Sequence, residues 1–328
     1  MSKPTDAAGP VDVVPGLTVA LAQRLRAAGL DPAAVAGFVA AALAEDLAGG
    51  TDVTTAATVA AGSAGCADLV ARSAGVVAGL PVAAAVFALV PPGPVAGARQ
   101  AGLDCADLVA DGGRVAAGQP VMRVTGPVGP ILTAERTALN LLCHLSGVAT
   151  LTRQWADAIS GTGARIRDTR KTTPGMRALE KYAVRCGGGL NHRMALSDAA
   201  LVKDNHVAAA GSVAAAFAAV RSAAPGLRLE VECDTLDQVA EALAAGADEI
   251  LLDNFTVSDI AAAVALTGGR ARLEASGGLT LRTARAVAET GVDYLAVGAL
   301  THSAPALDIG LDLVLANATN GTPDATDD

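Results

Sequence analysis

The chain has 328 residues, of which 52% are hydrophobic, 17% charged and 2% aromatic, and its formal net charge is -9. This length is enough for two domains, each with its own hydrophobic core. An acidic chain with few aromatic residues is a poor candidate for nucleic-acid binding, which requires a broad basic face or stacking platforms. The chain also lacks an uninterrupted run of about 18 apolar residues, which argues against a membrane span.

The five cysteines are scattered at positions 66, 105, 143, 186 and 233 without CxxC spacing. This distribution argues for reduced thiols rather than disulfides or zinc ligands. The first residues, MSKPTDAAGPVDVVPG, do not follow the charged-then-apolar pattern of a secretory signal. Together these features predict a cytoplasmic protein.

The N-terminal part of the chain predicts a mixed α and β domain over residues 16–134. A helix is expected over 32–47, after a capping aspartate, and another near 81–90. Between and after these helices, short apolar segments are interrupted by Gly and Pro, which is typical of turns between strands. The ends of the chain, residues 1–15 and 317–328, are expected to be a loose N-terminus and a disordered tail.

After this domain a long helical stretch is followed by alternating short apolar runs and Ala-rich helical stretches. The predicted strands cover residues 164–169, 199–203, 227–233, 249–254, 271–276 and 294–299. The ends of the last four, Glu232, Asp253, Ser276 and Gly298, are 21, 23 and 22 residues apart, a period typical of β/α units laid side by side. Eight full units need roughly 250 residues, so we expect an incomplete parallel β/α barrel of six or seven strands over 135–316.

Positive charge is concentrated in one segment of this acidic chain. Nine of the 24 Lys and Arg residues lie between Arg165 and His206, against four acidic residues, so this segment is +5 and the remainder is -14. Three of the four lysines, Lys171, Lys181 and Lys203, lie in it. Lysine offers a compact, strongly hydrated point charge with a tunable pKa. The segment therefore predicts a site for an anion-rich substrate.

Polar candidates follow the predicted strands, at the carboxyl ends where barrel active sites form. Arg170 and Lys171 follow the first barrel strand and Lys203 the second, while Glu232 and Asp253 end the third and fourth. Because the cations interrupt strand ends and Gly-rich loops, a site is favoured over a solvated surface. The two carboxylates would hold sugar hydroxyls, a Mg²⁺ ion or both. The alternative is a structural salt bridge to a nearby cation.

Small residues follow the last two predicted strands, in EASGGLT and AVGALT. Backbone N–H groups at a helix start bind anions, and loops after late barrel strands often hold phosphate. A plain tight turn is the alternative for each. The phosphate candidates are Ser276, Gly277, Gly278 and Gly298.

His192 stands next to Arg193, which favours anion binding, and a buried histidine or a metal ligand are the alternatives. A zinc site is not expected, because Cys186, His192 and His206 lack zinc-ligand spacing. His192 and Arg193 therefore join the candidate site.

One family resemblance rests on six stretches: AERTALNLLCHLSGVAT, RDTRKTTPGMRALEKYAVRCGGGLNHRMALSDAALVKDNH, EVEC, LLDNF, EASGG and VGALTHSAPALD. These stretches occur in the order in which they are found in the quinolinate phosphoribosyltransferases, also called carboxylating nicotinate-nucleotide pyrophosphorylases. The chain resembles this family from about residue 40 to 312. The resemblance implies an N-terminal α/β sandwich domain and an incomplete barrel. It also implies a homodimer in which each site is completed by the neighbour's N-terminal domain.

The activity implied by this resemblance is phosphoribosyl transfer from phosphoribosyl pyrophosphate to quinolinate with decarboxylation, which yields nicotinate mononucleotide, pyrophosphate and CO₂ for NAD biosynthesis. Mg²⁺ is the implied cofactor, and Arg136 would reach the partner's substrate. Positions that bind the two substrates match Arg170, Lys171, His192, Arg193 and Lys203. Those around the ribose and Mg²⁺ match Glu232 and Asp253, and the phosphate-binding turns match Ser276, Gly277, Gly278 and Gly298. Lys171, Glu232 and Asp253 are the predicted catalytic residues, and Glu232 and Asp253 the predicted metal ligands.

Two other functions remain open from the sequence. A Schiff-base lyase would use Lys203 or Lys171 as its nucleophile, which leaves the other cations unexplained. A catalytically idle anion-binding paralogue is the second alternative. The intact set of cations and carboxylates argues against it.

Overall fold

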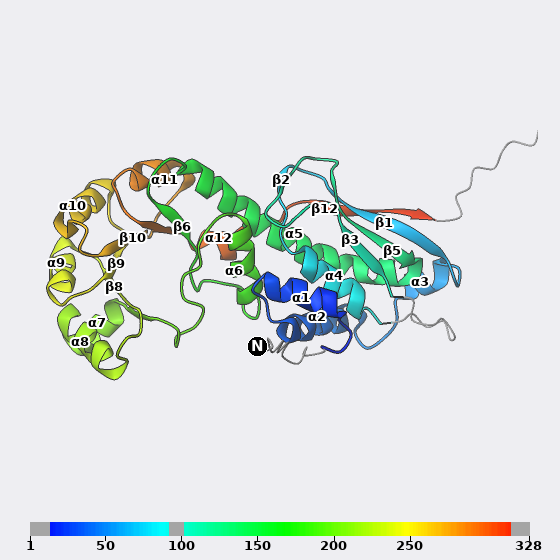
Figure 1. Ribbon diagram of the computed structural model, residues 1–328, viewed down its shortest axis with the longest axis horizontal. Coiled ribbons are helices and arrows are strands. Elements are labelled where there is room, and N and C mark those ends of the chain that lie inside the picture. Colours follow the sequence, from blue (N-terminus) through cyan, green and yellow to red (C-terminus); the bar gives the residue numbers. More distant parts are fainter. Residues whose placement is uncertain (1–13, 92–101, 316–328) are drawn as a thin grey trace, which may run out of the picture. The chain divides into compact units, whose positions relative to one another are not determined.

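The structure is a computed structural model that describes residues 14–91 and 102–315 (Figure 1). The chain forms two compact units, one of Met1–Ser146 with Ala306–Asp328 and the other of Gly147–Pro305. We call the first the sheet unit and the second the barrel unit.

The sheet unit is built on a four-stranded antiparallel sheet in the order β12-β1-β5-β3. Its strands are β1 (Ala64–Ala71), β3 (Asp104–Asp107), β5 (Pro120–Pro127) and β12 (Ile309–Leu315), beside a separate pair of β2 (Gly75–Val76) and β4 (Arg114–Val115). Alternate residues of the central strands, among them Leu69 and Val124, are buried. On the other face Asp68 and Arg123 lie opposite each other and form an ion pair of 2.7 Å, a cross-strand pairing that stabilises the sheet.

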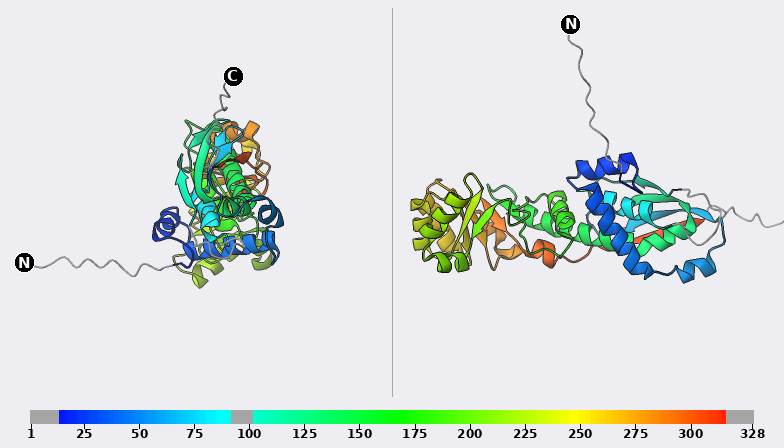
Figure 2. Two further views of the ribbon diagram at one scale, coloured as in Figure 1. Left: turned by 90° about the vertical axis from the view of Figure 1, so that its right-hand side faces the viewer. Right: turned by 90° about the horizontal axis from the view of Figure 1, so that it is seen from below.

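The described part of the sheet unit contains five helices or parts of helices. They are α1 (Val19–Ala27), α2 (Pro32–Leu47), α3 (Val53–Thr58), α4 (Leu80–Leu89) and the first part of α5 (Val128–Ala158). Both α1 and α2 pack against α4, as the two sets of views show (Figure 1 and Figure 2). The start of α4 is tightly packed, because a Cβ at Gly79 would lie 2.8 Å from Leu145, and Asp111 accepts hydrogen bonds from the backbone N–H groups of Gly79 and Leu80. The helices predicted at 32–47 and 81–90 correspond to α2 and α4.

The barrel unit contains a six-stranded parallel sheet in the order β6-β11-β10-β9-β8-β7. The strands are β6 (Arg165–Arg167), β7 (Ala200–Val202), β8 (Leu229–Cys233), β9 (Glu249–Asp253), β10 (Arg272–Ser276) and β11 (Tyr294–Ala296). The helices are α6 (Arg177–Cys186), α7 (Asp204–Ala210), α8 (Val213–Ala223), α9 (Leu236–Ala244), α10 (Val257–Thr267), α11 (Leu281–Ala288) and α12 (Ala299–His302). Figure 1 shows α9, α10 and α11 along the convex side of the curved sheet. Each predicted barrel strand is present, and the prediction of an incomplete barrel is confirmed.

The barrel is open between its two edge strands, β6 and β7. Part of the edge of β6 is covered by the segment that follows α6, where Leu190 forms an isolated parallel bridge with Arg167. The backbone N–H of Leu190 donates to Ile166 O at 2.8 Å, and that of Asp168 donates to Leu190 O at 3.0 Å. The segment that carries His192 is therefore held against the first barrel strand.

The observed division of the chain differs from the predicted one at two points. The predicted boundary between residues 134 and 135 falls inside α5, whose helical pattern continues without a break, and the compact units divide after Ser146. Residues 306–315 also belong to the sheet unit, because β12 pairs with β1. Pairing between such distant segments leaves no local signal in the sequence. Of the predicted loose ends, residues 1–13 and 316–328 lie outside the described residues.

None of the described helices is by itself both long and apolar enough to cross a membrane. The pairs α1 with α2 and α7 with α8 reach that length and hydropathy only when joined across bends of 107° and 91°.

Candidate active site

The carboxyl ends of the six parallel strands lie at one edge of the barrel sheet. In this register Asp253 and Ser276, the last residues of β9 and β10, are direct neighbours. The same edge holds Arg170 and Lys171 after β6, Lys203 after β7, Glu232 in β8 and Gly298 after β11. The fold thus brings the candidates from the barrel strands to one edge, as the sequence predicts.

Lys203 and Glu232 form an ion pair across the ends of β7 and β8. The lysine side chain is 45% exposed and that of the glutamate 10%, so a ligand can reach both groups. An ammonium group held by a carboxylate is a poor nucleophile, which argues against Lys203 as the nucleophile of a Schiff-base lyase. The salt bridge considered from the sequence is present, and it lies at the mouth of the barrel.

Asp253 is oriented by the residue after it, Asn254, which is not among the site residues predicted from the sequence. Asn254 Nδ2 donates to Asp253 Oδ2 at 2.7 Å, and its backbone N–H donates to Ser276 O at 2.9 Å. Asn254 has a left-handed backbone with φ of 58°, a conformation that asparagine tolerates better than most residues. A Cβ at Gly277 would lie only 2.2 Å from Asn254 Oδ1. The turns after β9 and β10 therefore fit together only with glycine at 277.

Lys171 lies over Gly298, so the turns after β6 and β11 are in contact. A Cβ at Gly298 would lie 3.0 Å from Lys171 Cδ and 3.3 Å from His302 Nε2. The hydroxyl of Thr301 donates to Lys171 O at 2.8 Å and so anchors the lysine backbone. The small residue predicted for phosphate binding also makes room for the lysine side chain.

The positive charges of Arg170 and Arg193 act on each other. Burial lowers the pKa of Arg193, and the nearby positive charge of Arg170 lowers this pKa further. Arg193 donates to Ala199 O at 2.9 Å, whereas Arg170 Nε is buried without a hydrogen-bond partner. Among the described residues, neither arginine nor Lys171 has an acidic group within ion-pair distance. Like charges without acidic partners are suited to an anion.

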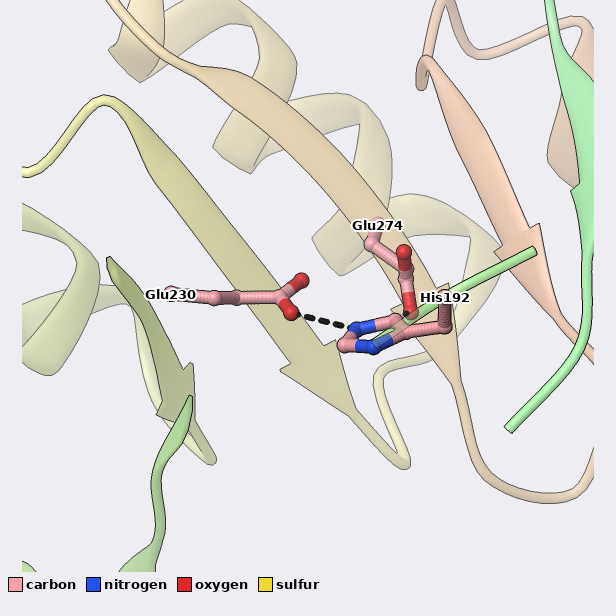
Figure 3. Close-up of side chains that lie close together, drawn as sticks. All are labelled: His192, Glu230 and Glu274. Atoms are coloured by element: carbon pink, nitrogen blue, oxygen red, sulfur yellow. Dashed lines mark hydrogen bonds and ion pairs between the residues drawn. The ribbon is translucent and has the colours of Figure 1, made fainter. Parts of the chain in front are cut away.

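His192 lies one layer below this mouth, between the carboxylates of Glu230 and Glu274 (Figure 3). Its Nε2 is 2.7 Å from Glu230 Oε2 and 3.7 Å from Glu274 Oε1, and its Nδ1 accepts a hydrogen bond of 2.7 Å from the N–H of Arg193. Because Nδ1 is an acceptor, this network assigns the ring proton to Nε2. Both ring nitrogens are thus occupied within the protein, and contact between His192 and a substrate stays a prediction.

The two glutamates come from the inward face of the sheet. Side chains alternate along a strand, so Glu230 shares its face with Glu232, and Glu274 shares its face with Ser276. The outward residues of β8, Leu229, Val231 and Cys233, are buried. In β8 the carboxylates at every second position, Glu230 and Glu232, are the sequence signal for this lower layer, whereas the predicted site includes only Glu232.

Titratable groups of the lower layer have shifted pKa values because they are buried. Arg167 contacts Glu274 and lies 2.8 Å from Glu249 Oε1, with its guanidinium 3.6 Å from the ring centre of Tyr294. Burial raises the pKa of Glu230 to about 7, and that of Glu274 to about 7. Burial lowers the pKa of His192.

A metal ion does not fit this lower layer well. The donor atoms of His192, Glu230 and Glu274 lie within 4.8 Å of one another. However, a guanidinium already contacts Glu274, and the imidazole is already hydrogen-bonded to Glu230. With both carboxyl pKa values near neutrality, a bound proton suits the cluster better than a divalent cation.

The basic segment is partly structural. Of its nine cations, Arg167 and Lys181 are buried in ion pairs inside the barrel unit. The glycine triplet in RCGGGLNHR also has a packing role, because a Cβ at Gly187 would lie 2.5 Å from Ala149 O and one at Gly189 would lie 2.9 Å from Thr152 Cγ2. The triplet therefore lets the chain pass close to α5 before it reaches His192.

Arg136 lies on the part of α5 that belongs to the sheet unit, and its side chain is exposed. Its predicted contact with the substrate of a neighbouring subunit is taken up with the proposed function.

Comparison with known proteins gives one consistent result. Residues 52–146 match the sequence model of the quinolinate phosphoribosyl transferase N-terminal domain, and residues 148–312 match that of the C-terminal domain. The chain is 54% identical over 278 residues to the carboxylating nicotinate-nucleotide pyrophosphorylase of Mycobacterium leprae, which covers 83% of this chain and 94% of the relative. It is 38% identical over 296 residues to the decarboxylating quinolinate phosphoribosyltransferase 1b of Nicotiana tabacum, covering 84% and 81%.

Solved structures agree with these relatives. NadC from Streptococcus pyogenes has a TM-score of 0.81 and 41% identity, covering 87% of this chain and 98% of that one. The nicotinate-nucleotide pyrophosphorylase from Francisella tularensis has a TM-score of 0.80 and 38% identity, covering 86% and 96%. The fold, the matched domains and the similarity over most of both chains show that this chain belongs to the quinolinate phosphoribosyl transferase family.

Proposed function

We propose that this chain transfers the phosphoribosyl group of phosphoribosyl pyrophosphate to quinolinate and releases CO₂. The products are nicotinate mononucleotide and pyrophosphate, and the reaction serves NAD biosynthesis. Family membership supports the reaction. The observation that carries it to this chain is that Arg170 and Arg193 repel each other electrostatically, while neither they nor Lys171 form an ion pair with an acidic group in the described part of the chain.

Quinolinate carries two carboxylates on adjacent ring carbons, and the co-substrate carries a phosphate and a pyrophosphate. Guanidinium groups bind carboxylates through paired, parallel hydrogen bonds, whereas lysine contributes a point charge. We assign Arg170 and Arg193 to the dicarboxylate and Lys171 and Lys203 to the anionic substrates at the mouth. His192 supports Arg193 through its hydrogen bond to the Arg193 backbone.

In the transfer step, the pyridine nitrogen forms a bond to the anomeric carbon while the bond from that carbon to the pyrophosphate oxygen breaks. The ribose carbon gains positive character in this step. We propose that Glu232 and Asp253 hold the ribose hydroxyls and lie near this developing charge. The turns that contain Ser276, Gly277 and Gly298 hold phosphate oxygens. Orientation and electrostatic stabilisation can each supply several kcal/mol of the barrier reduction.

In the second step the bond between the ring and its 2-carboxylate breaks. The electron pair stays on the ring carbon next to the cationic nitrogen, which stabilises it, and a proton then adds to that carbon. A cation that binds the 2-carboxylate must therefore hold it without strongly favouring the charged carboxylate over CO₂.

We also propose that Mg²⁺ is bound by Glu232 and Asp253. Both carboxylates are partly exposed at the ends of neighbouring strands, and hard oxygen donors shared with phosphates suit Mg²⁺. When bound, the ion supplies positive charge for the departing pyrophosphate. Lys203, already paired with Glu232, lies where it adds to that charge.

We propose a homodimer in which Arg136 of each chain reaches the substrate of the other. The exposed position of Arg136 on α5 supports this assembly. We place the enzyme in the cytoplasm, which agrees with its five free cysteines.

The test is a Mg²⁺-dependent assay of the purified protein with phosphoribosyl pyrophosphate and either quinolinate or nicotinate. We expect mononucleotide from quinolinate alone, with one CO₂ per product. Turnover of nicotinate, or turnover of neither acid, would contradict the proposal. Omission of Mg²⁺, with chelator present, tests the metal assignment in the same assay.

A further inference from the structure

Asp168 and Lys181 form a buried ion pair. It lies near the two chain segments that carry Arg170 and Arg193. Both side chains have 0% exposure, and Lys181 Nζ lies 2.5 Å from Asp168 Oδ1. Asp168 directly follows β6, and Lys181 lies in the middle of α6. Burial raises the pKa of the Asp168 carboxyl and lowers that of the Lys181 amine, while the contact between the two groups opposes both shifts.

Each member of this pair also binds the segment before Arg193. Asp168 Oδ1 accepts a hydrogen bond of 2.8 Å from the N–H of His192, and Lys181 Nζ donates to the carbonyl of the same residue at 2.9 Å. Asn191 completes the arrangement, because its Nδ2 donates to Asp168 Oδ2 at 2.6 Å and to Lys181 O at 2.8 Å. The backbone of His192 is therefore held through both its N–H and its carbonyl, and the side chain of Asn191 is bound beside it.

The Asp168–Lys181 ion pair lies between the chain segments that carry the two candidate anion-binding arginines, Arg170 and Arg193. Arg170 follows Asp168 by two residues on one side, and Arg193 follows His192 directly on the other. Only short stretches of chain separate the ion pair from each guanidinium. Movement of the residue 191–193 segment relative to β6 would change the separation of Arg170 and Arg193.

Stability alone does not account for this arrangement. A buried ion pair often contributes no more to folding than apolar side chains of the same volume, because the desolvation of both charges offsets their attraction. Its hydrogen bonds, however, define one backbone geometry, which apolar side chains do not.

We infer that Asp168 and Lys181 are positioning residues, which set the spacing of Arg170 and Arg193 and thereby the fit of an aromatic ortho-dicarboxylate. The identity of that ligand as quinolinate rests on the proposed function. The ion pair does not contact the substrate, and it acts through the backbone of His192.

The test uses the double variant Asp168→Asn/Lys181→Met, which removes both charges and leaves no unpaired buried charge. Its control is Asp68→Asn/Arg123→Met, which removes another hydrogen-bonded ion pair, of 2.7 Å, from the sheet unit and leaves the contacts of His192 unchanged. We measure KM and kcat for quinolinate, thermal stability, and calorimetric binding of phthalate, an unreactive ortho-dicarboxylate.

For the double variant we expect the KM for quinolinate to rise, and phthalate affinity to fall, by roughly tenfold or more, with a smaller change in kcat. The control variant should keep both values within about twofold, whatever its loss of stability. A folded double variant with the phthalate affinity of the unmodified protein would overturn the inference and leave the pair a purely structural role.

Asn191→Ala provides a milder variant, because Asn191 is only partly buried and the ion pair remains. It should weaken phthalate binding in the same direction, and unchanged binding would count against the inference. Phthalate binding requires no turnover. If phthalate binding depends on the Asp168–Lys181 ion pair but the protein does not convert quinolinate, the proposed function is refuted and the positioning role is not.

Discussion

Single residues of this site differ in whether they serve ligand binding or folding. Lys171 is exposed at the mouth, and its side chain lies over Gly298 rather than in the core. Lys181, ten residues later, is wholly buried and paired with Asp168. The sequence shows both as lysines of one basic segment, and only burial distinguishes their roles.

Lys171→Ala should reduce kcat/KM for quinolinate by about 100-fold or more, because it removes a cation from the anion site. The melting temperature should stay within a few degrees of the unmodified protein, because surface substitutions usually change stability by less than about 0.5 kcal/mol. Steady-state kinetics and thermal unfolding measure the two effects. Arg282→Ala, an exposed cation on α11, is the control and should change neither. Equal losses of turnover and stability in Lys171→Ala would contradict the assignment.

Glu274→Gln should change how stability depends on pH. The pKa of Glu274 is raised from 4.5 to about 7 by burial, with the charge of Glu230 as the next cause. Between these two values the folded state binds more protons than the unfolded state, so the stability contribution of Glu274 falls as pH rises through this window. The loss is complete above pH 7 and amounts to at most about 3 kcal/mol.

Denaturant unfolding from pH 5.5 to 8.5 measures this effect as a difference between the two proteins. The stability of Glu274→Gln relative to the unmodified protein should increase with pH, because glutamine does not titrate. Burial lowers the pKa of His192 and the charge of Glu274 opposes that shift, so glutamine at 274 lowers the His192 pKa further and adds to the same increase with pH. A difference that stays constant over this range would show that Glu274 is ionised throughout.

At the scale of elements, the turns after the barrel strands are shaped by close packing as much as by ligand binding. Gly277 and Gly278 both have left-handed backbones, with φ of 80° and 60°. A Cβ at Gly277 would collide with Asn254, whereas one at Gly278 would meet nothing within 4 Å. Substitutions at Gly277 and Gly278 therefore distinguish the cost of backbone strain from the cost of disturbing the contact between neighbouring turns.

Gly278→Ala should cost about 1 kcal/mol, the strain of a left-handed alanine. Gly277→Ala should cost at least about 2 kcal/mol, because strain is joined by the displacement of Asn254. It should also weaken the binding of phosphoribosyl pyrophosphate more than Gly278→Ala does. Denaturant unfolding and the KM for this substrate test both statements, and equal effects of the two variants would refute the role of the Asn254 contact.

At the scale of the whole molecule, β12 returns the chain from the barrel unit to the sheet unit. It pairs with β1 over seven residues, from Ala71 opposite Ile309 to Gly65 opposite Leu315. Truncation after Asp308 should strongly destabilise the sheet unit and promote aggregation, because it exposes the edge of β1. Truncation after Leu315 is the control and should keep the melting temperature. Equal stability of the two truncated proteins would refute a structural role for β12.

Much of the barrel unit was predictable because its signals are local. Each of its strands is a short apolar run, and the regular spacing of Glu232, Asp253, Ser276 and Gly298 indicated repeated β/α units at whose ends the candidates lie. The pattern could not show that β12 belongs to the other unit, since strand pairing across the chain depends on contacts that no local segment contains.

The sequence by itself determined the parallel barrel, the cationic character of its mouth and the family to which the chain is similar, because periodicity, charge and motifs are properties of neighbouring residues. Only the tertiary structure decided that Lys181 is buried with Asp168, and that both ring nitrogens of His192 are occupied. It also revealed the buried layer of Glu230 and Glu274 beneath the mouth. These features depend on burial and on distances between remote segments, which arise only when the chain folds.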